Sequence, residues 1–222
     1  MNNKQSRRKF IVNGSKIIAT IIGIITFGKY SSASQTRNKT NTIVKNTIKK
    51  DSYKNRILIA YDSRFGSTAE VAKFIAENLV INEQLIDVKK IDKVTNLSHY
   101  SHIIIGSAIQ YDNWMTEARE FIIENEVELS TKSVSFFLVC LVLSKKTKKA
   151  NLKASSYAEK IRNLAPQIKI RDFGKFAGVL DYSKMSLGQR ILAKGIFAII
   201  GVKKGDYRDW ENIKKWSKKI KI

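Results

Sequence analysis

The chain has 222 residues, of which 43% are hydrophobic, enough for one domain with a substantial core. Its single cysteine excludes an intramolecular disulfide and a multi-cysteine metal site. The formal net charge of +22 lies mainly at the two ends: residues 1–55 carry twelve Lys or Arg against one acid, and residues 166–222 carry fourteen against five. Basic ends beside apolar stretches favour an anionic membrane surface over nucleic acid, with simple solubilising charge as the alternative.

The N-terminus resembles an export signal. Ser6-Arg-Arg-Lys-Phe-Ile11 has the twin-arginine pattern, an uncharged apolar run spans Ile17–Phe27, and Ser31–Ala33 offers the small residues that a signal peptidase reads. We therefore predict a leader over residues 1–33, a polar linker over residues 34–55, and export to the extracytoplasmic side of the membrane. The alternative is an uncleaved N-terminal helix that holds the protein at the cytoplasmic face.

From residue 56 onward, strand-like and helical patterns alternate, and a fifth, interrupted strand fits between Ile168 and Leu180. This alternation predicts an α/β fold, a doubly wound parallel sheet with helices on both faces. For such a sheet we expect the strand order 2-1-3-4-5, which is one of the two common orders of this class. The other predicted strands are Ile57–Tyr61, Leu85–Ile91, His102–Ser107 and Ser133–Leu143, and the predicted helices are Ala69–Leu79, Thr116–Glu126 and Ser155–Leu164.

The loop after the first strand is suited to an anion. Ser63, Ser67 and Thr68 offer hydroxyl donors, Gly66 lets the backbone come close, and the following helix adds a partial positive charge at its N-terminus. The loop lacks the Lys of nucleoside-triphosphate loops and the three glycines of the dinucleotide fingerprint. A phosphate held by hydroxyls and amides indicates flavin mononucleotide (FMN); an ordinary turn with a Ser or Thr N-cap is the alternative.

In the predicted strand order, the loops after the first, third and fourth strands meet at one edge of the sheet. The loop after the third strand contains Tyr111 and Trp114, whose flat side chains suit stacking on, or bordering, an isoalloxazine ring. Burial beneath the next helix is the alternative for both. Gly106 and Ser107 would let backbone amides approach polar atoms of the ring.

Two residue types that often carry chemistry are predicted to be inert here. Cys140 lies inside an apolar run, so we expect a buried thiol. His99 and His102 have no third ligand nearby, so we expect surface and strand residues and no metal site.

Five segments of the chain together resemble the flavodoxin-like family, most closely the menaquinone-dependent protoporphyrinogen dehydrogenases. The resemblance implies a flavodoxin-like fold, FMN as cofactor, a protoporphyrinogen-like substrate and a quinone as acceptor. Two features depart from the family: Gln110 stands where Arg is frequent, and relatives act at the cytoplasmic face, where no export leader is needed. The segments are Ser63–Thr68, Ile105–Asp112, Phe136–Ser144, Phe176–Tyr182 and Tyr207–Glu211.

We expect an FMN-dependent oxidoreductase whose partner is a quinone or a redox protein. The alternatives are a non-enzymatic FMN electron carrier that docks on protein partners and a flavin-free binding module. We assign no catalytic acid or base. The predicted cofactor-binding residues are Ser63, Arg64, Phe65, Gly66, Ser67 and Thr68 after the first strand, Ser107, Ala108, Ile109, Gln110 and Tyr111 after the third, and Leu141 and Val142 after the fourth.

A basic and apolar helical extension is predicted over about residues 183–222 of the 56–222 domain. Within it, Met185–Val202 starts amphipathic and ends almost wholly apolar. Either this helix packs on the domain, or it lies in a membrane interface with Lys194, Lys203 and Lys204 at the headgroups. The second interpretation would bring the flavin near a lipid-soluble quinone.

Overall fold

The computed structural model describes residues 56–79 and 85–220. The chain divides into two units, Met1–Asn46 and Thr47–Ile222, and all described residues belong to the second. The predicted leader (residues 1–33) and linker (residues 34–55) lie outside the described residues.

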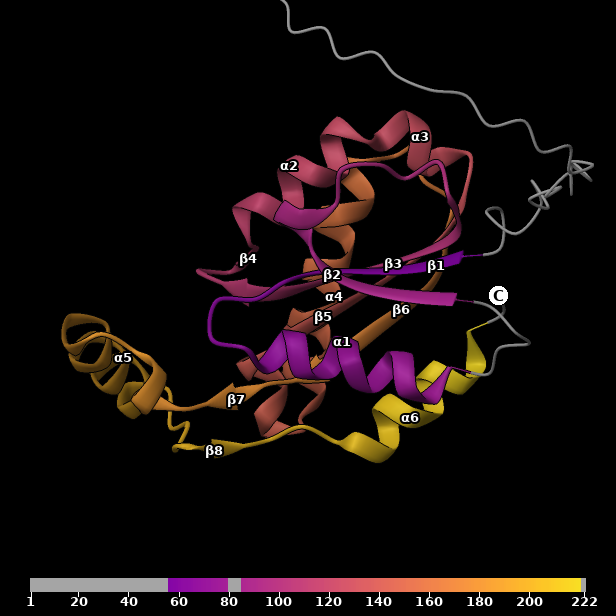
Figure 1. The fold of residues 1–222 in the computed structure, drawn as a ribbon. Helices are drawn as coiled ribbons and strands as arrows, with labels where there is room; N and C mark the ends of the chain where they lie inside the picture. Colours follow the sequence, from indigo (N-terminus) through magenta and orange to yellow (C-terminus); the bar gives the residue numbers. More distant parts are fainter. Residues whose placement is uncertain (1–55, 80–84, 221–222) are drawn as a thin grey trace, which may run out of the picture. The chain divides into compact units, whose positions relative to one another are not determined.

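A parallel sheet forms the centre of the domain (Figure 1). Its strand order, β2-β1-β3-β5-β6, is the predicted 2-1-3-4-5 once the short β4 is set aside, so the predicted fold class is confirmed. β4 (Asn113–Trp114) pairs antiparallel with the end of β3. The parallel strands are β1 (Arg56–Asp62), β2 (Leu85–Lys90), β3 (Tyr100–Gln110), β5 (Ser133–Cys140) and β6 (Ile170–Ala177).

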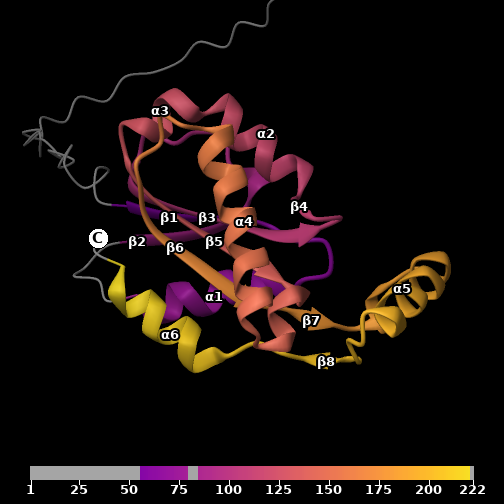
Figure 2. The same cartoon turned by 180° about the vertical axis from the view of Figure 1, so that it is seen from behind.

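Helices cover both faces of this sheet, as Figures 1 and 2 show. One face carries α1 (Ser67–Asn78) and α6 (Trp210–Lys219), and the other carries α2 (Thr116–Glu124), α3 (Glu126–Ser130) and α4 (Lys148–Leu164). Because successive strand residues point to opposite faces, the strands divide their apolar side chains between two core clusters. In β1, for example, Ile57 packs with α1 while Leu58 packs under α2 and α4.

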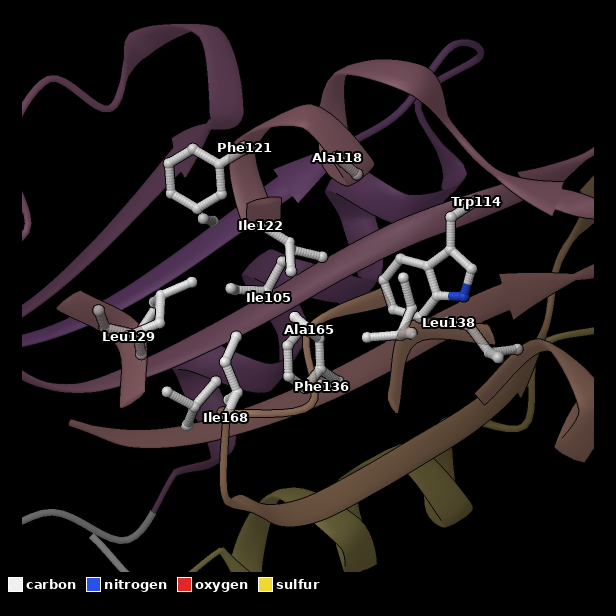
Figure 3. Close-up of a cluster of buried hydrophobic side chains, with 14 of the residues drawn as sticks. Ile105, Trp114, Ala118, Phe121, Ile122, Leu129, Phe136, Leu138, Ala165 and Ile168 are labelled. Carbon is white, nitrogen blue, oxygen red and sulfur yellow. The ribbon is translucent and has the colours of Figure 1, made fainter. Parts of the chain in front are cut away.

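Trp114 belongs to the core beneath α2 (Figure 3). It is 2% exposed, meets the Phe136 ring edge-on at 6.0 Å between centroids, and donates its indole N–H to the Tyr157 carbonyl at 2.9 Å. The interpretation of Trp114 as a stacking residue for a flavin is therefore wrong, and burial is the correct alternative.

Several element boundaries differ from the sequence prediction. The strand predicted through Leu143 ends at Cys140, because Leu141–Lys145 turns into a short 3₁₀ helix, η2. The helix predicted to start at Ser155 begins at Lys148, capped by the Thr147 hydroxyl, which accepts from the Ala150 N–H. Its first turns bury only alanines, which give a weak hydrophobic pattern in the sequence.

Residues 179–206 form a separate feature that we call the arm. It leaves the sheet at β7 (Val179–Leu180), passes a 3₁₀ turn η3 (Tyr182–Lys184) and helix α5 (Leu187–Ile199), and returns at β8 (Gly205–Asp206), which pairs antiparallel with β7. In Figures 1 and 2, α5 stands off the domain at the end of these strands. α5 buries no residue among the described parts of the chain, so packing of this helix on the domain is the wrong alternative. None of the described helices is long and apolar enough to span a bilayer.

Candidate functional site

The loop between β1 and α1 is built as an anion cradle. Gly66 is the N-cap of α1 and has a φ of 92°, in the left-handed region that favours glycine. Having no side chain, it cannot cap the helix, and no other described side chain does so. The first amides of α1 therefore lack helical or capping partners and are available to a ligand. The Ser63 hydroxyl braces the loop by accepting from the Gly66 N–H at 3.1 Å.

Thr68, in the first turn of α1, carries an unpaired buried hydroxyl. The residue is fully buried, and its Oγ1 finds no hydrogen-bond partner within the described parts of the chain. Leaving a buried hydroxyl unpaired costs about 1–3 kcal/mol. The cost disappears when an oxyanion accepts this hydrogen bond, so Thr68 supports a built ligand site and disfavours the ordinary-turn interpretation.

The loop after β3 is a tight hairpin that presents Tyr111. Tyr111 and Asp112 both have positive φ values, 48° and 60°, which is the conformation of a type I′ turn between Gln110 and Asn113. Two residues with side chains in the left-handed region carry backbone strain. The Tyr111 side chain is 85% exposed, in contrast to the buried Trp114.

Helix α4 holds this strained turn in place. The Asp112 carboxylate accepts from the Lys153 ammonium at 2.7 Å and from the Tyr157 hydroxyl at 2.6 Å. These two hydrogen bonds lower the pKa of Asp112, which keeps the carboxylate ionised. The turn that carries Tyr111 is thereby anchored to a helix that lies more than forty residues away in the sequence.

The remaining residues predicted in this loop have mixed roles. The buried Ser107 hydroxyl donates to the Ala108 carbonyl (2.8 Å) and accepts from the Met115 N–H (3.1 Å), so the hairpin occupies it. Ile109 packs against the core. Just before the loop, Gly106 lies where a Cβ would collide with the Phe137 ring, so packing by itself requires glycine there.

A cavity of about 780 Å³ opens between the first two loops. It lies beside the carboxyl ends of β1 and β3, the point at which the strand order reverses and at which such sheets bind their ligands. The guanidinium of Arg64 joins the loops by donating to Gln110 Oε1 at 3.4 Å. The lining includes four predicted residues, Ser63, Arg64, Gln110 and Tyr111, together with Asp62, Lys90, Thr116, Glu117 and Arg119.

The third predicted loop lies one strand further along the same edge. β5 pairs with β3 up to Ala108↔Val139, and the η2 turn begins directly after it with Leu141 and Val142. Val142 packs against the core, and neither residue lines the 780 Å³ cavity. The structure thus brings the three loops to one edge and joins only the first two around this cavity.

Sequence reasoning missed several charged residues at the site, among them Asp62 and Lys184. Asp62, the last residue of β1, is 2% exposed with an unpaired Oδ2, and burial and the nearby Glu117 charge raise its pKa. The only sequence signal for a role of Asp62 in the site was its position at the carboxyl end of an apolar strand. Lys184 comes from the foot of the arm, and its Nζ lies 3.6 Å from the point where a Cβ on Gly66 would stand.

Ion pairs connect the first turn of α1 with Lys184 of the arm and with Arg208 just beyond it. Lys184 and Arg208 both pair with Glu70 of α1, at 3.7 and 2.6 Å. A small cavity of about 90 Å³ lies between the first loop and the arm. Phe65 and Ser67 line it from the loop, and Lys184 and Met185 are among the residues that line it from the arm. No pattern in the sequence could place Lys184 here, because more than a hundred residues separate it from the loop.

Cys140 and His102, which were expected to be inert, lie inside the sheet, whereas His99 is exposed just before β3. Cys140 is 3% exposed, and burial raises the pKa of its thiol to about 11. His102 is also buried, with Nε2 3.3 Å from the Ser135 hydroxyl, and burial lowers its pKa to about 4. The described residues contain no group of three or more His, Cys, Asp or Glu side chains arranged to hold a metal ion.

The fold is a doubly wound α/β sheet, and its uncapped helix N-terminus behind a hydroxyl-bearing loop at the switch point is the arrangement with which such sheets bind phosphate groups. A family model described as a flavodoxin domain matches residues 58–206. That match covers more than half of the chain, and the chain therefore belongs to the flavodoxin domain family.

The chain is also similar to solved structures. A flavodoxin from the domain Archaea has 16% identity and a TM-score of 0.42, over 66% of this chain and 99% of that one. Flavodoxin 1 from Bacillus cereus has 18% identity and a TM-score of 0.42, over 65% of this chain and 97% of that one. A flavoprotein from Lactobacillus acidophilus in complex with FMN has 16% identity and a TM-score of 0.40, over 55% of this chain and 93% of that one. We carry no residue role over from these structures. No curated protein sequence matches the chain.

Proposed function

We propose that this protein binds FMN in the edge site formed by the β1 and β3 loops and works as an FMN-dependent oxidoreductase. The observation that carries the proposal is the cradle at α1: uncapped helix amides beside the buried, unpaired hydroxyl of Thr68. Membership of the flavodoxin domain family supports the choice of FMN over other phosphate ligands. FMN supplies the redox chemistry, and the protein binds and orients it.

The residues present fit such a cofactor. The amides of the first turn of α1 and the hydroxyls of Ser67 and Thr68 would hold the phosphate, and the Lys184 ammonium beside the loop adds a cation. Glu70 keeps its closer partner, Arg208, when Lys184 turns toward a phosphate. Tyr111 offers an exposed aromatic ring at the mouth of the cavity, where it would border the flavin.

Protoporphyrinogen, or a similar reduced substrate, and a quinone acceptor are the partners that we propose from the family resemblance of the sequence. That family frequently has Arg at the position of Gln110. Here the Arg64 guanidinium lies against the Gln110 side chain, so a cation still occupies this part of the cavity. Lys90 and Arg119 also line the cavity and, together with Arg64, outnumber its acids Asp62 and Glu117, which favours a substrate with carboxylate groups.

A non-enzymatic electron carrier is the second candidate. The exposed position of Tyr111 favours it, because an open aromatic ring at the flavin edge suits docking of a protein partner. The charge of the chain favours the enzyme, since residues 56–165 carry fifteen basic and thirteen acidic side chains and offer no excess of acid for docking.

Visible absorption of the purified protein with added FMN tests the proposal. Stoichiometric flavin bands that follow the protein through gel filtration are the expected result, and their absence would favour the flavin-free binding module. Bleaching of the bands by protoporphyrinogen under anaerobic conditions, with return of the bands on addition of menadione, would identify the enzyme. Flavin bands that respond only to a reduced redox protein would identify the carrier.

A further inference from the structure

The outer surface of α5 is an apolar face that no other described part of the chain covers. Leu187, Ile191 and Ile199 are 72%, 66% and 88% exposed, and Leu192 and Ile196 are exposed as well. At 3.6 residues per turn, these five side chains fall within about half of the helix circumference, and only Gly188, Gly195 and Ala198 lie among them. A soluble domain gains nothing from exposing so many large aliphatic side chains together.

The segment that carries this face has charges of one sign. Residues 182–205 contain no Asp or Glu and five Lys or Arg: Lys184, Arg190, Lys194, Lys203 and Lys204. Arg190 turns inward, where its Nε donates to the Tyr182 carbonyl at 3.0 Å. Lys203 and Lys204 are exposed just beyond the end of α5, and Lys204 also pairs with Asp181 at the start of the arm, at 3.5 Å.

An anionic lipid surface matches both properties. An apolar face flanked by Lys side chains sinks into the boundary between headgroups and acyl chains while the ammonium groups meet lipid phosphates. A second copy of the chain would bring the same cations together and would leave them without counter-charges. A helix of 13 residues is too short to cross the bilayer, so it would lie in the interface plane.

We propose that α5 docks the protein on the surface of an anionic membrane, with Ile191 and Ile199 among the side chains that enter the lipid. The membrane contact itself does not depend on a flavin. Its connection with quinone chemistry rests on the proposed function: the foot of the arm lies against Phe65 and Ser67 of the first loop, so a docked α5 would hold the flavin site near lipid-soluble quinones.

Vesicle flotation of the full chain tests the docking surface. The vesicles contain equal parts of phosphatidylglycerol and phosphatidylcholine, and pure phosphatidylcholine vesicles show the contribution of charge. The double variant Ile191→Glu/Ile199→Glu should bind at least about tenfold more weakly than the parent, because two aliphatic side chains no longer enter lipid. The matched control is Val127→Glu/Leu152→Glu, which places the same charges on helices α3 and α4 at residues 72% and 64% exposed, and it should bind like the parent.

A local probe separates α5 from the basic N-terminal part of the chain. Cys140 is buried, so an environment-sensitive thiol dye reacts selectively at Ile199→Cys or, as control, at Val127→Cys. Anionic vesicles should shift the emission of the dye to the blue in the Ile199→Cys variant and leave it unchanged in the Val127→Cys variant. Equal flotation of the double variant and the parent, or no shift at Ile199→Cys, would overturn the proposal.

Sedimentation without lipid supplies the other decisive outcome. A dimer that the Ile191→Glu/Ile199→Glu variant disrupts would identify a second copy as the occupant of the face and overturn the lipid assignment. The flavin spectrum of the same samples reports on the proposed function separately. Vesicle binding without flavin bands would support the docking surface and reject the FMN site. Flavin bands without vesicle binding would support the FMN site and reject the docking surface.

Discussion

At the scale of single residues, a substitution of Thr68 should have opposite effects on FMN binding and on the stability of the FMN-free protein. The variant Thr68→Val removes the hydroxyl and keeps the shape of the buried side chain. We expect FMN to bind about 10- to 100-fold more weakly, since a phosphate loses a donor worth about 1–3 kcal/mol. The FMN-free protein should be equally or more stable, because the unpaired Oγ1 is gone. Flavin fluorescence titration and urea unfolding measure the two effects.

Thr68→Ser is the matched control, because it keeps a hydroxyl at this position. It should retain most of the FMN affinity while losing some stability through the deleted methyl group. If Thr68→Val binds FMN as tightly as the parent, the α1 cradle is not the phosphate site.

Tyr111 is a second residue at which conformation and function are opposed. Its φ of 48° is unfavourable for a side chain, and its ring makes little contact, being 85% exposed. We expect Tyr111→Gly to stabilise the FMN-free protein by about 1 kcal/mol through relief of this strain, and to weaken FMN binding several-fold. Thermal unfolding with and without FMN measures both; a variant less stable than the parent would mean that the ring has a structural role.

At the scale of secondary-structure elements, the central strand β3 gives the domain a pH dependence. His102 is buried in β3, and its pKa falls from 6.5 to about 4 on folding. Between these values the unfolded chain binds the proton and the folded chain does not, so stability decreases as the pH falls. The expected loss is up to about 3 kcal/mol.

The variant His102→Gln should remove this dependence while keeping a polar side chain opposite Ser135. Urea midpoints measured from neutral pH down to about pH 4 should then decline less steeply than those of the parent. The comparison uses the slope against pH, so it holds even where the variant is uniformly less stable. Equal slopes would show that His102 is not the group responsible.

The elements differ in how well the sequence predicted them. β1, α1 and the loop between them were predicted closely, because apolar runs and turn residues are local signals. The start of α4 was missed because Ala150 and Ala154 give a faint pattern. The hairpin at Tyr111 and Asp112 was missed as well, because Tyr is not a residue type that favours a left-handed turn and no Gly follows Asp112. Its stability comes from Lys153 and Tyr157 of α4.

For the whole molecule, the uneven charge makes a prediction about location. Residues 1–55 hold twelve of the Lys and Arg residues, including the pair Arg7 and Arg8 of the twin-arginine pattern. We propose export, and expect the double variant Arg7→Lys/Arg8→Lys to stay in the cytoplasm as folded protein. Arg37→Lys, the same substitution outside the pattern, is the control and should be exported like the parent.

Cell fractionation with an antibody against the folded domain measures this outcome. Equal export of the double variant and the parent would exclude a twin-arginine signal. Retention of the parent itself would favour the alternative of an N-terminal helix at the cytoplasmic face.

The sequence by itself determined the alternation of strands and helices that makes a parallel sheet, and the hydroxyl-bearing loop after β1, because these depend on hydrophobic periodicity and on turn residues close together in the chain. The strand order was expected from the class of fold, and the structure confirms it. Only the tertiary structure decided which aromatic residue of the second loop is available. Trp114 is buried against Phe136 and Tyr157, whereas Tyr111 is left outside. The tertiary structure also places Lys184 beside Gly66 and leaves the apolar face of α5 uncovered by other described residues. The burial of a side chain and its distance from another residue depend on partners far away in the sequence, so local sequence patterns cannot predict them.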